Sequence, residues 1–67
     1  MSVAKIIEIS SESSEGFEAA IREGIARAAK TLKNIKGAWI QNQQVVVQDQ
    51  KIVAYRVDMK VTFLMED

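Results

Sequence analysis

The chain has 67 residues, which is the size of one small domain. Its nine Lys and Arg residues balance its nine Asp and Glu residues, so no net charge favours nucleic acid or anionic lipid as a partner. Neither Cys nor His is present, which excludes disulfides, the usual zinc clusters, thiol chemistry and catalytic triads built on an imidazole base. Because a domain of this size buries only about 60% of the surface that its unfolded chain exposes, oligomerisation is the remaining source of stability.

The first element that the sequence predicts is a strand at residues 3–10, where β-branched residues alternate with others. One side of this strand is expected to hold Val3, Lys5, Ile7 and Ile9, and the other side Ala4, Ile6 and Glu8.

An amphipathic helix is expected at residues 14–33. The hydroxyl-rich segment from Ser10 to Ser14 offers oxygen atoms to the free amide groups of a helix start. Gly24 lies inside this helix, where Gly costs about 1 kcal/mol relative to Ala, so we expect a close approach to another backbone there. Apolar residues recur every three or four positions in one stripe, formed by Phe17, Ile21, Ile25, Ala28 and Leu32.

Gly37 ends the helical pattern, and two alternating runs then predict strands at residues 38–48 and 52–65, joined by a tight turn at 48–51. One face of the first run is expected to hold Trp39, Gln41, Gln43, Val45 and Val47. One face of the second run is expected to hold Val53, Tyr55, Val57, Met59, Val61, Phe63 and Met65.

The order strand, helix, strand, strand predicts an α+β fold of the βαββ type, with one helix on one face of a three-stranded sheet. A right-handed crossover leaves the last strand between the other two and antiparallel to both. The long edges and the half-polar open face of this sheet favour contact with neighbouring subunits.

Trp39 is the most informative candidate for ligand contact, and the alternative is an anchor in the core or in an interface. The amides of Gln41 and its neighbours can hydrogen-bond to a heterocycle or to another subunit. Arg56 can bind a phosphate or carboxylate, or pair with Asp58 or Glu66 across an interface. The carboxylates lack the paired, unequal environments that acid–base catalysis needs. We therefore expect no enzyme and no metal site, apart from the alternative of a weak ion site with oxygen ligands.

The first six residues lack the basic region and the apolar run of a secretory signal. No segment approaches the roughly 20 apolar residues that span a bilayer. We expect a cytoplasmic protein that binds neither membrane nor nucleic acid.

Several segments together resemble the dodecin family over essentially the whole chain. They are Glu18-Ala19-Ala20-Ile21, Ile25-Ala26-Arg27-Ala28, Thr31-Leu32 and Tyr55-Arg56-Val57-Asp58-Met59-Lys60-Val61-Thr62-Phe63. The resemblance implies a single domain at residues 1–67, a sheet wrapped around one helix, and twelve subunits assembled as a hollow sphere. It also implies storage or sequestration of a flavin, FMN or riboflavin, with coenzyme A held by some members.

In that family a Trp at the start of the second strand stacks on the flavin, and a Gln after the aromatic residue of the last strand hydrogen-bonds to it. Alignment from Thr31-Leu32 and from Tyr55 places these two positions on Gly37 and Arg56, so both ligand residues are replaced. Trp39 lies two residues beyond Gly37, on the same face of the strand, and is expected to present its ring to the same cavity.

The ligand-binding residues expected from the residue pattern and the resemblance are Trp39, Arg56, Gly37 and Gln41. Flavin storage predicts that Trp39 and Arg56 converge near a symmetry axis with room for a ring. The alternative is a shell of the same architecture that holds another small ligand such as coenzyme A, holds ions, or is purely structural. In that case Trp39 packs into a subunit interface.

Overall fold

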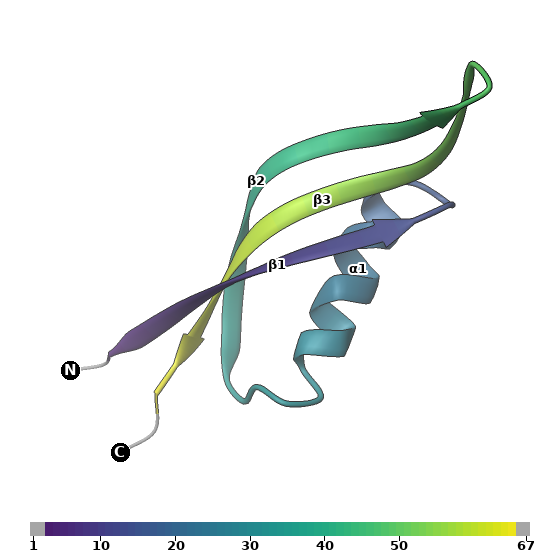
Figure 1. The fold of residues 1–67 in the computed structure, drawn as a ribbon. Coiled ribbons are helices and arrows are strands. Elements are labelled where there is room, and N and C mark those ends of the chain that lie inside the picture. Colours follow the sequence, from purple (N-terminus) through teal and green to yellow (C-terminus); the bar gives the residue numbers. More distant parts are fainter. Residues whose placement is uncertain (1–2, 66–67) are drawn as a thin grey trace.

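The computed structural model describes residues 3–65 and has the element order β1 (Ala4–Ser13), α1 (Phe17–Ala28), β2 (Ile35–Gln48) and β3 (Lys51–Leu64). β3 lies between β1 and β2 and is antiparallel to both. The sheet curves, and α1 covers one of its faces (Figure 1). The α+β fold and the central position of the last strand, both expected from the sequence, are confirmed.

The core lies between α1 and the middle of β3. Val57, Met59 and Val61 are fully buried, as is Ala20 of the helix. The partly buried residues packed against this cluster are Ile9, Phe17, Ile21, Ile25 and Ile40. The expected apolar faces of the helix and of the last strand therefore meet, because their contact removes both faces from water.

α1 approaches the sheet closely at Gly24. A Cβ atom added there would lie 2.5 Å from Met59 Cε and 3.0 Å from Ser11 Cβ. Both distances are shorter than the 3.5–4.0 Å of ordinary carbon contacts. The close packing predicted at Gly24 is confirmed, but the expected backbone neighbour was wrong, because the atoms nearest to it belong to the side chains of Met59 and Ser11.

The end of β1 and the start of α1 differ from the prediction. β1 continues through Ser13, whose partner on β3 is Tyr55. α1 begins only at Phe17, after Gly16 with a φ of 145°, and no side chain caps its first turn. The hydroxyl-rich segment was wrongly assigned to a helix start because pairing with β3 satisfies its backbone groups instead.

The end of α1 and the start of β2 also differ from the prediction. α1 ends at Ala28, whose carbonyl accepts hydrogen bonds from the N–H groups of Thr31 and Leu32 at 3.1 and 2.9 Å. Asn34 then has a φ of 62°, a left-handed conformation that Asn tolerates. β2 starts directly afterwards, at Ile35, so Gly37 lies inside the strand and does not mark its boundary.

β2 does not keep one set of side chains on one face. Its pairing with β3 shifts between Ile40 and Asn42, which leaves Gln41 as an extra residue. Trp39 is opposite Lys60, on the face turned away from α1, whereas Gln43 is opposite the buried Val57. The face expected for Trp39, Gln41, Gln43, Val45 and Val47 was wrong, because a bulge reverses the alternation of side chains.

A tight turn joins β2 to β3, as the sequence predicts. Asp49 and Gln50 have φ values of 51° and 67°, the positive range of a two-residue type I′ hairpin. Gln48 and Lys51 close the turn as a strand pair. The hairpin extends past the end of β1 and beyond the helix (Figure 1), which makes the subunit 51 Å long but only 20 and 13 Å across.

Candidate ligand-binding site

Three of the four candidate ligand residues lie on the sheet face turned away from α1. Residues paired directly across antiparallel strands point to the same face. Gly37 is opposite Thr62 and Trp39 is opposite Lys60. Arg56 lies four residues before Lys60 on β3, and an even spacing along a strand keeps it on the same face. Gln41 is exposed and is the extra residue of the bulge, with no partner in the register of β3.

Trp39 is 67% exposed, so within one subunit it is not a core residue. The Nζ atom of Lys60 lies over its ring, 5.7 Å from the centroid. A cation at this distance is attracted by the electron-rich face of an indole, by about 0.5–1 kcal/mol at an exposed site. The ring therefore has one face near an ammonium group and a large area free to contact a ligand or a second subunit.

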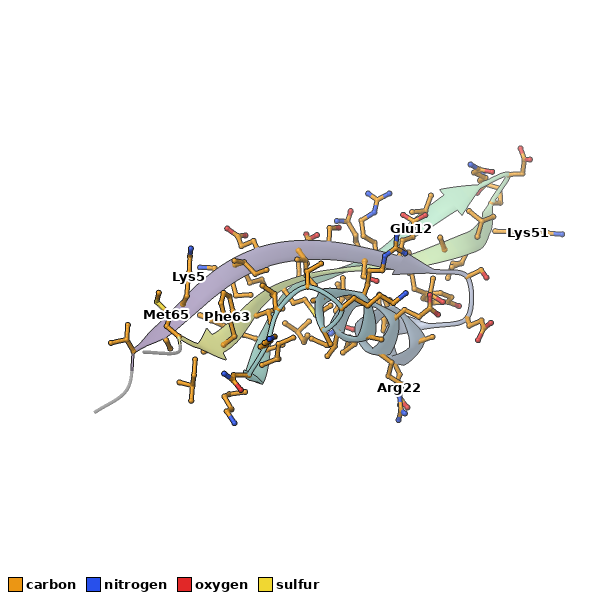
Figure 2. All side chains as sticks on the ribbon, turned by 90° about the horizontal axis from the view of Figure 1, so that it is seen from below. Lys5, Glu12, Arg22, Lys51, Phe63 and Met65 are labelled. Atoms are coloured by element: carbon orange, nitrogen blue, oxygen red, sulfur yellow. The ribbon has the colours of Figure 1, made fainter. Side chains whose placement is uncertain are left out.

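Arg56 is held by Glu12 of the neighbouring strand β1. Its Nε and Nη2 atoms donate to Glu12 Oε1 at 2.9 and 2.7 Å. Figure 2 shows Glu12 near the end of β1, on the opposite side of the strand from α1. Within the chain, the partner of Arg56 is Glu12. The expected pairing with Asp58 or Glu66 lies across a subunit interface and stays a prediction, and Glu66 is outside the described residues. The charge of Arg56 is thus balanced within the subunit.

Trp39 and Arg56 do not converge within one subunit. The partner of Trp39 on β3 is Lys60, four residues beyond Arg56, and four residues of a strand span about 13 Å. A ligand that touches both side chains would need them from different subunits.

Two charged neighbours of these candidates were missed by the sequence analysis. Lys60 reaches the Trp39 ring and Glu12 reaches Arg56 through pairing across the sheet. Glu12 and Arg56 are 44 positions apart in sequence. Only the strand register brings such residues together, and a local pattern does not encode it.

A second surface feature is a groove of about 640 Å³ between β1 and α1. The residues that line it are Ile7, Ile9, Ser10, Ser11, Glu12, Glu23, Gly24, Arg27, Ala28, Thr31 and Leu32. No three acidic side chains gather into a metal-sized cluster among residues 3–65. In the same part of the chain, the helix is too short and too polar to cross a bilayer.

The sequence resembles one family of known proteins over nearly its whole length. It matches the family described as Dodecin at residues 3–66. It is 32% identical over 65 residues to the dodecin of Thermus thermophilus, covering 97% of this chain and 94% of the relative. It is also 32% identical over 65 residues to the calcium dodecin of Mycobacterium tuberculosis, covering 97% of this chain and 92% of the relative.

Solved structures show the same likeness. An arginine-to-alanine variant of the T. thermophilus dodecin has a TM-score of 0.95 at 31% identity, with both chains fully covered. Dodecin from Streptomyces davaonensis has a TM-score of 0.94 at 32% identity, covering 98% of this chain and 97% of its own. The M. tuberculosis calcium dodecin, described as calcium-chelating with a novel calcium-binding site, has a TM-score of 0.84 at 30% identity, covering 96% and 91%.

Proposed function

This chain belongs to the dodecin family, and we propose that it forms a hollow homo-oligomer of twelve subunits that binds and stores a flavin without transforming it. The observation that carries the proposal is the exposed ring of Trp39 on an open sheet face. An indole of this kind is a stacking surface for a planar heterocycle such as the isoalloxazine of FMN or riboflavin.

The surroundings of Trp39 leave room for such a ring. A Cβ atom added to Gly37, two residues before Trp39, would meet nothing within 4 Å. Gly37 therefore leaves the strand surface beside the indole open to a ligand. In the proposed site the ring of Trp39 stacks on the flavin, and Gln41 and an Arg56 of a neighbouring subunit supply hydrogen bonds.

The ion pair of Arg56 with Glu12 limits what this arginine offers. The bonds to Glu12 use the N–H of Nε and one N–H of Nη2, so both N–H groups of Nη1 and the second one of Nη2 are left for a flavin carbonyl. A carbonyl acceptor suits this neutralised pair better than a phosphate does, because Glu12 repels a second anion.

The test is a titration of riboflavin and of FMN into the purified assembly, followed by flavin fluorescence. We expect quenching of the flavin, and a dissociation constant raised about 5- to 150-fold by Trp39→Ala, the range of a lost stacking contact of roughly 1–3 kcal/mol. Trp39→Phe should keep most of the affinity, and Val3→Ala, at another exposed apolar residue, should keep all of it. Absence of quenching at micromolar protein would contradict flavin storage.

A second candidate function is a shell of the same architecture that holds calcium. It is favoured by the similarity to the protein named calcium dodecin. In this chain the carboxylates would have to come from more than one subunit, because residues 3–65 contain no cluster of three. Isothermal titration calorimetry with calcium chloride tests calcium binding, and Asp58→Asn is the variant expected to weaken it. A titration with coenzyme A in the same way tests the alternative of that ligand.

A further inference from the structure

The outer part of the β2–β3 hairpin has no third strand beside it among residues 3–65. The last pair of β1 and β3 is Ser13 with Tyr55, so residues 46–54 form a two-stranded ribbon (Figure 1). Val47 and Ile52 are partners across this ribbon and are 55% and 53% exposed. Because a two-stranded ribbon is only marginally stable in water, these apolar side chains indicate a surface that another chain covers.

The groove between β1 and α1 is the matching cavity. It runs along β1, an edge strand of the sheet, and along the second half of the helix. Its apolar lining includes Ile7, Ile9, Ala28 and Leu32, all of them only half-buried. With a volume of about 640 Å³, it is large enough to take several aliphatic side chains.

The charges of the hairpin tip and of the groove are complementary. Asp49 and Lys51 are exposed at the tip, and Figure 2 shows Lys51 at the outer end of the hairpin, beyond α1. Glu23 and Arg27 line the groove. None of these four residues belongs to an ion pair within residues 3–65. Within the subunit, the Glu23 carboxylate accepts a hydrogen bond from the Ser13 hydroxyl at 3.4 Å. Lys51 is thus complementary in charge to Glu23, and Asp49 is complementary to Arg27.

We infer that the hairpin tip of one subunit docks in the β1–α1 groove of a second copy of this chain. The inference rests on the proposed assembly and names the two surfaces that make it. Val47 and Ile52 occupy the apolar lining, where their burial supplies the hydrophobic part of the contact. The charged residues at the rim fix the orientation of the hairpin.

The contact is heterologous, because the tip and the groove are different surfaces of the subunit. Each subunit gives its tip to one neighbour and receives the tip of another. A contact of this type closes into a ring when its rotation is a whole fraction of a turn, and rings are the units from which a closed shell is built.

The absence of Cys in the chain makes a crosslinking test unambiguous. The double variant Ile52→Cys/Leu32→Cys is treated with a short bis-maleimide and separated under denaturing conditions. We expect covalent species at multiples of the 7.5 kDa subunit. Each single variant, and the matched control Val3→Cys/Leu32→Cys with an equally exposed apolar position away from the tip, should stay at one subunit.

Charge reversal provides a second measurement on the same contact. Lys51→Glu should raise the concentration at which the assembly dissociates, measured by native mass spectrometry, by about tenfold. The double variant Lys51→Glu/Glu23→Lys should restore it, while circular dichroism verifies that each variant is folded.

The outcomes separate the docking from the assembly itself. An oligomer that shows no crosslink between tip and groove, or whose Lys51→Glu defect is not repaired by Glu23→Lys, overturns the docking and leaves the proposed assembly standing. A chain that is monomeric at micromolar concentration overturns the proposed assembly and the docking with it.

Discussion

Gly24 is a residue at which one additional methyl group has little room. In Gly24→Ala the gain in helix propensity is about 1 kcal/mol, but the new Cβ meets Met59 Cε at 2.5 Å and Ser11 Cβ at 3.0 Å. Overpacking of this kind typically costs about 1–3 kcal/mol. We expect a net loss of about 1 kcal/mol in the free energy of unfolding, measured by chemical denaturation at a fixed protein concentration.

Gly37→Ala is the matched control for this substitution. Its added Cβ meets nothing within 4 Å, so the free energy of unfolding should change by less than about 0.5 kcal/mol. Equal stabilities of the Gly24 and Gly37 variants would mean that the buried methyl group of Met59 moves aside at no cost.

For single residues, the sequence predicts a role well when its cause lies in neighbouring positions of the chain. The close packing at Gly24 follows from a glycine inside an amphipathic pattern, and the structure confirms it. The partner of Arg56 within the chain was not predicted, since Glu12 lies on a strand 44 positions away. The roles of Trp39, Gly37 and Gln41 in ligand binding stay predictions, because they depend on atoms of other molecules.

At the scale of elements, the turn between β2 and β3 has a conformation that its residues do not favour. Asp49 and Gln50 both have positive φ values, and Asn-Gly is the preferred pair for this type of turn. The variant Asp49→Asn/Gln50→Gly should stabilise the protein by about 1 kcal/mol, the cost of one left-handed residue without Gly. A thermal melt at fixed concentration measures the change.

The opposite substitution checks the same argument. Gln50→Val places a β-branched side chain at a φ of 67°, which is strongly disfavoured, so its melting temperature should fall. A melting temperature that is the same for Gln50→Val and for the Asn-Gly variant would contradict a strained turn.

The type and order of the elements are predictable because hydrophobic periodicity sets them, as the apolar faces of α1 and β3 show. Their boundaries and the sidedness of β2 are not. The serines up to Ser13 are equally suited to a helix start and to a polar strand end, and the register with β3 selects the strand. The bulge at Gln41 arises from the same pairing and leaves no mark in the alternation of the sequence.

At the scale of the whole molecule, the core of one subunit is small. Met59, Val57 and Val61 are the largest side chains that are fully buried in the described part of the chain, and much apolar surface lies outside them. We therefore expect stability to depend on association, so that the melting temperature falls as the protein is diluted. Differential scanning fluorimetry over a hundredfold range of concentration measures this, and a constant melting temperature down to the concentration where the oligomer dissociates would contradict it.

The bulge at Gln41 has one more consequence, which concerns how this strand tolerates insertions and deletions. The extra residue acts like a frameshift: between Gly37 and Ile40, even-numbered side chains such as Ile40 face α1, and after Gln41, odd-numbered ones such as Gln43 do. Loss of Gln41 would join the two frames into one regular ladder, in which Ile40 stays opposite Met59 and Trp39 stays opposite Lys60, so both side chains keep their faces. A gap of one residue at the bulge thus leaves the outside and the inside of the sheet unchanged, whereas the same gap at a regular position of β2 would exchange them on one side of the gap.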